Sequence, residues 1–390
     1  MARRGAVLLL LVSLPAAAIP AFARRYKTSC ITCHTLPPQL NPAGQAFRAN
    51  GYRLPQGEPR RQEDDVQLGA PEWEALFPRS FLPGNVPEAS PVAGLFRAAI
   101  ESEKGQPESI ELLLAALAGG NLGKRASWFA EAGFTNRGAG LSRAWVSVDA
   151  TPWASVRAGQ MEPGIVPWSR FSHRLTYDEY LPFETKVGLI ELGAPRPAVE
   201  VAGAGSDPGP MRGLRYIVGI AAREQGGLAG DAYGRISYKF GGVAAAGDHG
   251  AGLAGPLTPP LAETSLQVGG FVYRASLGGP PNRSHALRGG ADVTLLIGQI
   301  EAMAGGWVGN DDLLAGTSSS LLAGAMLRPW PWLALLARYE TAQQAGSDAQ
   351  QRLVAAVRAA LQQNVQGTLE MKLEVPDANV GGVASVFVAL

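Results

Sequence analysis

From about residue 91 to its last residue, the chain consists of segments of roughly ten residues in which polar and apolar side chains alternate. Such alternation places successive side chains on opposite faces of an extended strand. In residues 231–240, for example, Arg235 and Lys239 fall on one face and Ile236 on the other. Gly, Pro, Asn and Asp residues separate the segments, as expected for turns. The pattern therefore predicts a domain built mainly from β-strands.

The number of segments and the composition predict an antiparallel transmembrane β-barrel over residues 91–390. About sixteen strands are expected, and an even number of strands of about 9–11 residues, polar inside and apolar outside, is typical of outer-membrane barrels. Charged residues make up 17% of the chain, below the roughly one quarter that is usual in soluble domains. This scarcity favours a lipid-facing surface over the two alternatives, a soluble β-sandwich and a β-solenoid. The predicted strands begin near Gly94, Ser109, Ala126, Leu141, Trp153, Lys186 (the weakest), Arg212, Asp231, Ser265, Ala286, Gly298, Ser319, Pro331, Arg352, Val365 and Gly381. Aromatic residues expected at the membrane interfaces are Trp128, Trp145, Trp153, Trp330, Trp332 and Tyr339.

The N-terminus has the three parts of a secretory signal peptide. A basic start is followed by an apolar run over residues 6–18 and by a small-residue cleavage site that ends at Ala23. Cleavage after Ala23 is therefore predicted, and it removes residues 1–23. A membrane anchor is the alternative, but the run is shorter than the about 20 apolar residues that span a bilayer, and Pro15 interrupts it.

The two cysteines of the chain, Cys30 and Cys33, belong to the run Cys-Ile-Thr-Cys-His that ends at His34. This C-x-x-C-H order is the attachment signature of c-type haem. Two thiols bind the two vinyl groups of the porphyrin, and the imidazole that follows turns back to the iron. A thioredoxin-like pair would sit in a βαβ context, and a zinc site would need two more Cys or His ligands nearby. We therefore predict one covalent haem c, bound through Cys30 and Cys33, with His34 as the proximal iron ligand.

The haem segment spans only residues 24–55 and is followed by a linker over residues 56–90 that is rich in proline and charge. A segment below about 40 residues rarely has a sufficient core of its own, so we expect the haem and the barrel to stabilise it. The segment contains no Met, and no His beyond the C-x-x-C-H motif, that could bind the iron on its second side. Later candidates for this distal ligand, nearest first, are Met161, His173, His249 and His285.

A short helix is predicted within the haem segment over residues 41–52. Pro42 suits the first turn of a helix and Gly51 suits its C-terminal cap. Phe47 and Tyr52 are positioned to pack on a haem face or in a small apolar core. The segment is thus a very small helical haem domain in front of the barrel.

Residues 161–183 break the rhythm of the strands with a dense group of charged and aromatic side chains. Long connections without regular structure are often functional. Three interpretations remain open for this segment: a loop that folds into the barrel lumen and constricts it, a contact with the haem segment, or an ordinary surface loop.

The N-terminal part resembles the fused monohaem cytochrome–porins of the outer membrane, best known as iron oxidases of iron-oxidising bacteria. The resemblance rests on residues 21–24, 30–34, 38–44, 47 and 51–52, with the later strands matching only in pattern and order. It implies a haem held in or at the mouth of a porin-like barrel. Electrons would pass from an extracellular donor such as Fe(II) to a periplasmic carrier such as a cytochrome, which would make the protein an oxidoreductase. Outer-membrane lipid is then the surroundings of the barrel, and a net charge of +1 indicates no nucleic-acid partner.

Two other functions remain open on the sequence. One is a solute porin with an accessory haem module for docking or sensing. The other is a soluble periplasmic cytochrome fused to a β-sandwich, which the architecture of residues 91–390 would decide.

Overall fold

The computed structural model describes the strands, most of the haem segment and many of the connections between them. The described residues are 22, 26, 32–53, 92–122, 125–136, 138–151, 153–165, 168, 176–177, 179–187, 190–205, 209–223, 227–247, 263–277, 284–312, 314–362, 365–375 and 379–389. Cys30, His173, His249, the linker over residues 56–90 and nearly all of the predicted signal peptide lie outside them. Within the described residues, no helix is long and apolar enough to cross a membrane.

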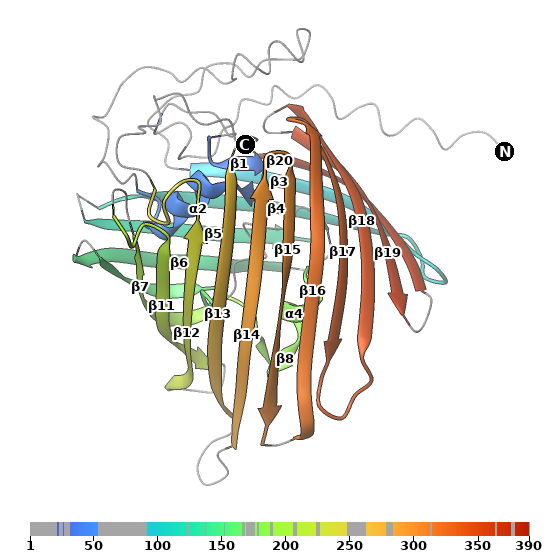
Figure 1. Ribbon diagram of the computed structural model, residues 1–390. Coiled ribbons are helices and arrows are strands. Elements are labelled where there is room, and N and C mark those ends of the chain that lie inside the picture. The colour runs from blue at the N-terminus through green and yellow to red at the C-terminus, as the bar shows by residue number, and fades with distance from the viewer. Residues whose placement is uncertain are drawn as a thin grey trace, which may run out of the picture.

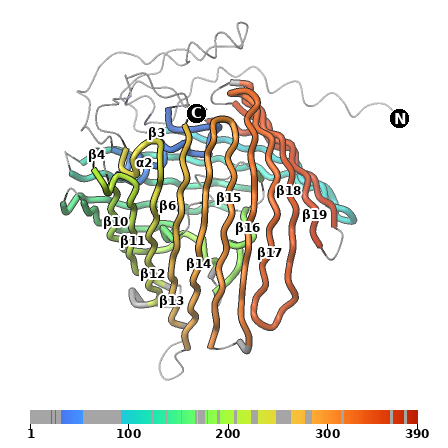
Figure 2. Tube along the Cα trace, viewed as in Figure 1, coloured from blue at the N-terminus to red at the C-terminus, as the bar shows by residue number. Residues whose placement is uncertain are grey.

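The described strands form one closed barrel of sixteen antiparallel strands, eleven in the run β10–β20 and five in the run β3–β7. Each strand pairs with its neighbour in the chain, β20 pairs with β3, and β7 pairs with β10 (Figures 1 and 2). The barrel strands are β3 (Val92–Glu103), β4 (Ser109–Asn121), β5 (Ala126–Thr135), β6 (Gly138–Thr151), β7 (Ala154–Met161), β10 (Arg196–Ala204), β11 (Leu214–Arg223), β12 (Gly227–Phe240), β13 (Thr264–Leu277), β14 (Ser284–Ile297), β15 (Ile300–Asp311), β16 (Leu314–Trp330), β17 (Leu333–Gln343), β18 (Gln350–Gln362), β19 (Val365–Val375) and β20 (Asn379–Ala389). This confirms the predicted barrel and excludes the β-sandwich and the β-solenoid.

Fifteen of the predicted strand starts agree with the barrel to within a few residues. A strand also begins at Lys186, but it has two residues and pairs in a separate two-stranded sheet, so it is not the sixth strand of the barrel. The sixth strand of the barrel is β10, which begins at Arg196. Pro197 lies inside this strand and argues against a strand on sequence grounds, because proline cannot donate a ladder hydrogen bond. Here its exposed side chain faces outward and the strand alternates regularly between buried and exposed residues.

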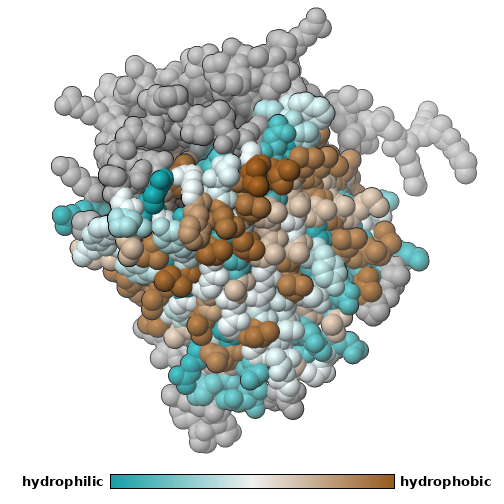
Figure 3. Space-filling view, in the orientation of Figure 1, coloured by the Kyte–Doolittle hydropathy of each residue, from teal (hydrophilic) through white to brown (hydrophobic). Residues whose placement is uncertain are grey.

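The wall of the barrel is apolar outside and polar inside, as the alternation predicts. Val218, Leu369 and Met371 are among the most exposed side chains of the strands, while Arg288 and Glu340 are completely buried. Figure 3 shows hydrophobic residues over the middle of the visible wall and hydrophilic residues along its lower rim. An outward apolar surface of this kind fits a lipid bilayer, in which the closed ladder leaves no unpaired strand edge.

The expected aromatic girdle is correct for some residues and wrong for one. Trp153 and Trp330 are 59% and 51% exposed, and both lie beside short turns at the same end of the barrel. Trp145 is instead only 6% exposed and belongs to the interior cluster of buried side chains. Its position on β6 places it on the inward face, where β5 and β6 present Phe129 and Trp145 to the lumen.

The haem segment forms a small folded unit at the end of the barrel where β3 begins and β20 ends (Figure 1). It contains the hairpin of β1 (His34–Leu36) and β2 (Gln39–Leu40), followed by α2 (Pro42–Ala49). The helix has Asn41 as its N-cap and Pro42 in its first turn, and Gly51 follows with a φ of +69°. This confirms the predicted helix and its end, since glycine favours the left-handed conformation after a helix.

The segment between β7 and β10 does not run over the surface. It includes α4 (Leu181–Glu184) and the two-residue strands β8 (Lys186–Val187) and β9 (Ile190–Glu191). Figure 1 shows α4 and β8 behind β15 and β16, inside the barrel. The predicted loop is therefore longer than residues 161–183 and enters the lumen.

Candidate functional site

The backbone around Cys33 and His34 is fixed by the residue that starts α2. The backbone N–H of Asn41 donates to the carbonyl oxygen of Cys33 at 3.0 Å. The Asn41 side chain donates to the carbonyl oxygen of Thr32 at 3.1 Å and accepts from the N–H of Gly44 at 2.9 Å. One asparagine thus caps the helix and holds the end of the C-x-x-C-H motif against it.

The helix lies so close to Cys33 that only glycine fits at one position. A Cβ atom on Gly44 would be 2.0 Å from the carbonyl oxygen of Cys33 and 3.0 Å from the side chain of Leu40. Real Cβ atoms do not approach a backbone oxygen to that distance, so a larger residue would move the helix away from the motif. The helix therefore acts as a rigid support for Cys33 and His34.

His34 has the properties expected of an iron ligand. Burial lowers the pKa of His34 to about 4, although hydrogen bonding to the backbone of Gln39 and of Pro38 opposes this shift. The imidazole is consequently neutral at neutral pH, which is the form that binds a metal ion. Its Nδ1 atom is buried and has no hydrogen-bond partner among the described residues. A buried unpaired nitrogen is costly. A bound metal ion would give the imidazole a partner, so the side chain fits the proximal iron position that the motif predicts for it.

The structure describes only some of the other predicted site residues. Cys30 and His173 lie outside the described residues, so their roles stay predictions. Met161 is 3% exposed and belongs to the interior cluster of the barrel. His285 lies on β14, where its backbone N–H donates to the carboxylate of Asp312 at 2.7 Å. No group of three or more His, Cys, Asp or Glu side chains within the described part of the chain is arranged to hold a metal ion.

Aromatic rings join the haem segment to one wall of the barrel. The ring of Tyr52 stacks on Trp145 with 5.6 Å between centroids and tilts against Phe129 at 5.1 Å. Its edge contact with Phe47 of α2 has a centroid distance of 5.7 Å. Arg157 of β7 lies 4.5 Å above the Trp145 ring and donates to a backbone oxygen of α2 at 3.3 Å. These contacts place Phe47 and Tyr52 in a core that the segment shares with β5, β6 and β7.

Apolar contacts on the opposite wall complete the attachment. Leu36 of β1 is 1% exposed and packs in a cluster with Met326, Ala334 and Ala360 of β16, β17 and β18. These strands are far from β5 and β6 around the barrel. The haem segment therefore reaches both walls, and we refer to residues 32–53 as the plug.

Ion pairs and hydrogen bonds tie the plug to the barrel at several points around its circumference. Arg53 forms an ion pair with Asp149 of β6, and Arg48 pairs with Glu162 after β7 at 3.4 Å. The side chain of Gln39 donates to Glu301 of β15 at 2.9 Å. Further contacts join Arg358 to the carbonyl oxygen of Pro37 at 2.5 Å and Asn50 to that of Ala246 at 2.5 Å. The plug is thus held from several directions, which fixes its orientation.

The loop between β7 and β10 crosses the lumen. The Tyr177 hydroxyl donates to Glu111 of β4 at 2.9 Å, and the Tyr177 N–H donates to Glu370 of β19 at 2.6 Å. The Trp307 indole of β15 donates to the carbonyl oxygen of Pro182 at 3.2 Å. The loop therefore bonds to several parts of the wall and enters the lumen, which is the first of the three interpretations left open by the sequence. The Arg48–Glu162 pair joins this connection to the haem segment as well, so the second interpretation also holds and the ordinary surface loop does not.

Sequence reasoning found the haem motif and missed most residues that position it. Asn41 was identifiable, because an asparagine followed by proline is a standard signal for a helix start. Gln39 and Arg53 carry no such signal, since their partners Glu301 and Asp149 lie 262 and 96 residues away. Only the closure of the barrel brings those partners to the plug.

Comparisons with known proteins show the fold of the barrel and no family. No protein-family model and no curated protein sequence matches the chain. Among solved structures, the chain is similar to OmpF of Salmonella typhi in complex with daunomycin (9% identity, 77% of this chain and 97% of the other, TM-score 0.57). It is also similar to an anion-selective porin from Comamonas acidovorans (12% identity, 77% and 98%, TM-score 0.56) and to OmpT of Vibrio cholerae (10% identity, 77% and 96%, TM-score 0.51). The chain therefore has a porin-like barrel, combined with a plug that carries Cys33 and His34.

Proposed function

We propose that the protein transfers electrons at the bacterial outer membrane through one c-type haem, attached to Cys30 and Cys33 and bound at the iron by His34. One observation carries the proposal: the C-x-x-C-H motif ends in a half-buried histidine whose buried Nδ1 atom has no partner among the described residues, on a plug that is built into a porin-like barrel. The outward apolar surface supports a membrane location. The predicted signal peptide supports export, which the covalent attachment of haem would require.

The residues of the plug have separate tasks in this proposal. The bound haem supplies a one-electron carrier whose potential depends on its iron ligands and surroundings. His34 contributes a neutral nitrogen, and Asn41 with Gly44 keep the motif against α2. Phe47 and Tyr52 exclude water from this side of the plug. A dry, rigid setting favours electron transfer because little reorganisation accompanies the change of charge.

The two closures of the lumen favour electron transfer over solute transport. The plug bonds to both walls at one end, and the loop between β7 and β10 bonds across the lumen from the other end. Electrons need no open pore, whereas a solute does. The plug end has several two-residue turns, such as the one between β16 and β17, and short turns are typical of the periplasmic side. The haem is then placed for delivery to a periplasmic carrier.

The attachment of haem is tested first. We expect the purified protein to show the absorbance of one covalent haem per chain after denaturation and acid–acetone extraction, which removes non-covalent haem. Cys33→Ala should lose one of the two thioether bonds, while Ser102→Ala, on the exposed face of β3, should retain both. Absence of covalent haem from the wild-type protein would refute the proposal.

The resemblance to iron oxidases makes Fe(II) the donor to test. In detergent or vesicles, we expect Fe(II) to reduce the haem in a stopped-flow experiment, at neutral or at acidic pH, without any other protein. A haem that ferrous iron fails to reduce at both pH values would leave electron transfer intact and remove the oxidase activity. A periplasmic cytochrome should then oxidise the reduced haem from the plug side.

Met161 and His173 are the proposed candidates for the distal ligand. Met161 adjoins Glu162, which pairs with Arg48 of the plug, and its side chain is buried among lumen residues. Replacing Met161 by Leu or His173 by Gln should change the Soret band if the residue binds the iron. Unchanged spectra in both variants would exclude these two ligands.

A solute porin with an accessory haem is the second candidate, because the solved structures of similar fold are porins. Reconstitution into planar bilayers distinguishes the two. The closed lumen predicts little conductance for the wild-type protein, and a steady open conductance would favour the porin.

A further inference from the structure

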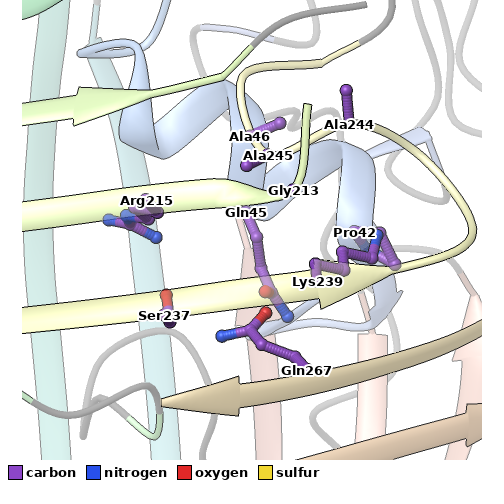
Figure 4. A pocket seen from close by; sticks show the side chains of 10 residues that line it. All are labelled: Pro42, Gln45, Ala46, Gly213, Arg215, Ser237, Lys239, Ala244, Ala245 and Gln267. Carbon is purple, nitrogen blue, oxygen red and sulfur yellow. The ribbon is translucent and has the colours of Figure 1, made fainter. Parts of the chain in front are cut away.

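A small cavity lies between the plug and the wall of the barrel, apart from Cys33 and His34. Figure 4 shows α2 on one side, with Gln45 pointing into the space, and the strands β11, β12 and β13 on the other. The segment with Ala244 and Ala245 closes it from above. Its volume is about 20 Å³, which is enough for one small ion or one or two water molecules.

The wall of the cavity is a compact polar patch set by the register of three strands. Arg215 of β11 lies opposite Ser237 of β12, and Lys239 of β12 lies opposite Gln267 of β13. All four point into the lumen and line the cavity, and Gln45 of the plug faces them (Figure 4). Five side chains that can donate hydrogen bonds therefore converge on one space.

The charges around the cavity do not balance. Lys239 is neutralised by Glu263, whose carboxylate is 2.6 Å away, and it also donates to the carbonyl oxygen of Val243 at 2.9 Å. Of the cations near the plug, Arg48 and Arg235 likewise each have a carboxylate. Arg215 has neither an ion pair nor a hydrogen bond to any described residue.

Two neutral groups beside Arg215 can also donate hydrogen bonds. The Ser237 hydroxyl, in a residue that is 5% exposed, and the amide of the half-buried Gln267 line the same space. A half-buried guanidinium without a carboxylate, flanked by neutral donors, is the chemistry that recognises an anion.

We propose that this cavity is a binding site for one small anion, a halide or a single carboxylate group, with Arg215 as its charged ligand and Ser237 and Gln267 as its neutral donors. The volume admits no porphyrin. A carboxylate has two sources: a free anion from solution, or a propionate of the haem, which rests on the proposed function. The plug helix packs on Cys33 through Gly44 and lines this cavity through Pro42, Gln45 and Ala46, so a propionate of a haem bound at the motif is the second source to test.

Chloride is the probe for the first source. In the full-length protein in detergent, chloride replaces gluconate at constant ionic strength, because gluconate is too large for the cavity. If the site takes a free anion, chloride raises the melting temperature in a saturable manner and gives a titration by calorimetry. Arg215→Gln should weaken chloride binding by about tenfold or more, since a charge-assisted hydrogen bond is lost. Gln267→Leu, a second variant within the cavity, should also weaken it.

The matched control is Arg125→Gln, an exposed arginine at the same end of the barrel that does not line the cavity. It removes the same charge and should leave chloride binding unchanged. If both arginine variants weaken binding equally, the effect is general electrostatics and the site is refuted.

The second source is tested through the haem itself. If a propionate fills the site, chloride has no saturable effect on the wild type. Arg215→Gln then lowers the midpoint potential and shifts the propionate bending band in the resonance Raman spectrum, while Arg125→Gln changes neither. A protein without chloride binding and without these changes in Arg215→Gln or Gln267→Leu holds only water here, and the proposal fails. A chain that carries no haem refutes the proposed function, and the chloride titration alone then decides the anion site.

Discussion

Replacing Tyr52 by alanine should loosen the plug while leaving the barrel folded. The phenol ring contacts Trp145, Phe129 and Phe47 at centroid distances of 5.6, 5.1 and 5.7 Å. Aromatic pairs are each worth about 0.5–1.5 kcal/mol beyond their buried area, so losing three costs about 2–4 kcal/mol. Phe22 also stacks on Tyr52, with 4.8 Å between ring centroids, and this contact is lost if cleavage occurs after Ala23 as predicted.

Hydrogen exchange of the plug measures this cost directly. Amide exchange reports the free energy of local opening, and 2–4 kcal/mol corresponds to about a 30- to 700-fold increase in the open population. We expect α2 amides to exchange faster by that factor in Tyr52→Ala, with the amides of β14 and β15 unchanged. Alanine keeps the Cβ atom, so the positive φ of 61° at this residue remains as strained as before.

Two variants separate ring contacts from other effects. Tyr52→Phe keeps the ring and should exchange like the wild type. Phe134→Ala removes an aromatic ring that is 48% exposed on the outside of β5 and should leave the plug unchanged. If Tyr52→Ala exchanges at the wild-type rate in a folded barrel, the aromatic contacts do not hold the plug and the reasoning is wrong.

Three further substitutions test the plug and the wall. Gly44→Ala places a Cβ atom 2.0 Å from the carbonyl oxygen of Cys33 and should reduce the fraction of chains with covalent haem, measured by haem absorbance per protein. Asp149→Asn leaves the buried Arg53 without its charged partner and should destabilise plug docking by about 2 kcal/mol, measured by exchange of α2 amides. Leu369→Arg puts a charge on an outward position that is 65% exposed and should cost about 2–4 kcal/mol of stability in lipid vesicles, measured by urea titration.

Each of these has a matched comparison within the chain. Gly367→Ala adds a Cβ atom with nothing within 4 Å and should not affect haem attachment. Exchanging the charges of Arg53 and Asp149 in one chain should recover part of the loss if the ion pair itself is responsible. Leu122→Arg, near the turn after β4, should cost less than Leu369→Arg because the penalty falls toward the membrane interface.

The parts of the fold that the sequence predicts are those with local causes. In β12 the alternation is visible because Arg235 and Lys239 are polar and their neighbours are apolar, so the strand and its inward face follow from period two. The ends of α2 follow from Asn41-Pro42 and from Gly51, which act within one helical turn. The C-x-x-C-H motif is local as well, since Cys30, Cys33 and His34 lie within five consecutive positions.

The parts that escape prediction depend on closure of the barrel. Period two already places Trp145 on the inward face of β6 with Arg143 and Ser147, so its assignment to an aromatic girdle is wrong; what no local pattern indicates is its stacking on Tyr52 of the plug. Strand β10 escapes prediction because Pro197 lies inside it. The contact of Arg358 with Pro37 joins residues 321 positions apart, and no local pattern indicates it. Closure of the barrel, with its register, brings Trp145, β10 and Arg358 to the places where the structure has them.

The small size of the plug connects its locally determined motif to the closure of the barrel. A segment of this length has too little apolar surface for its own core, and its apolar side chains Leu36 and Tyr52 pack against barrel residues. Most of the plug's polar anchors also end on the barrel or its connections, at Asp149, Glu162 and Glu301. The motif at His34 is therefore ordered by strands from both halves of the barrel. It follows that the position of His34 depends on barrel closure, so a substitution far along the chain, such as one at Glu301, acts on the proposed haem site through the plug.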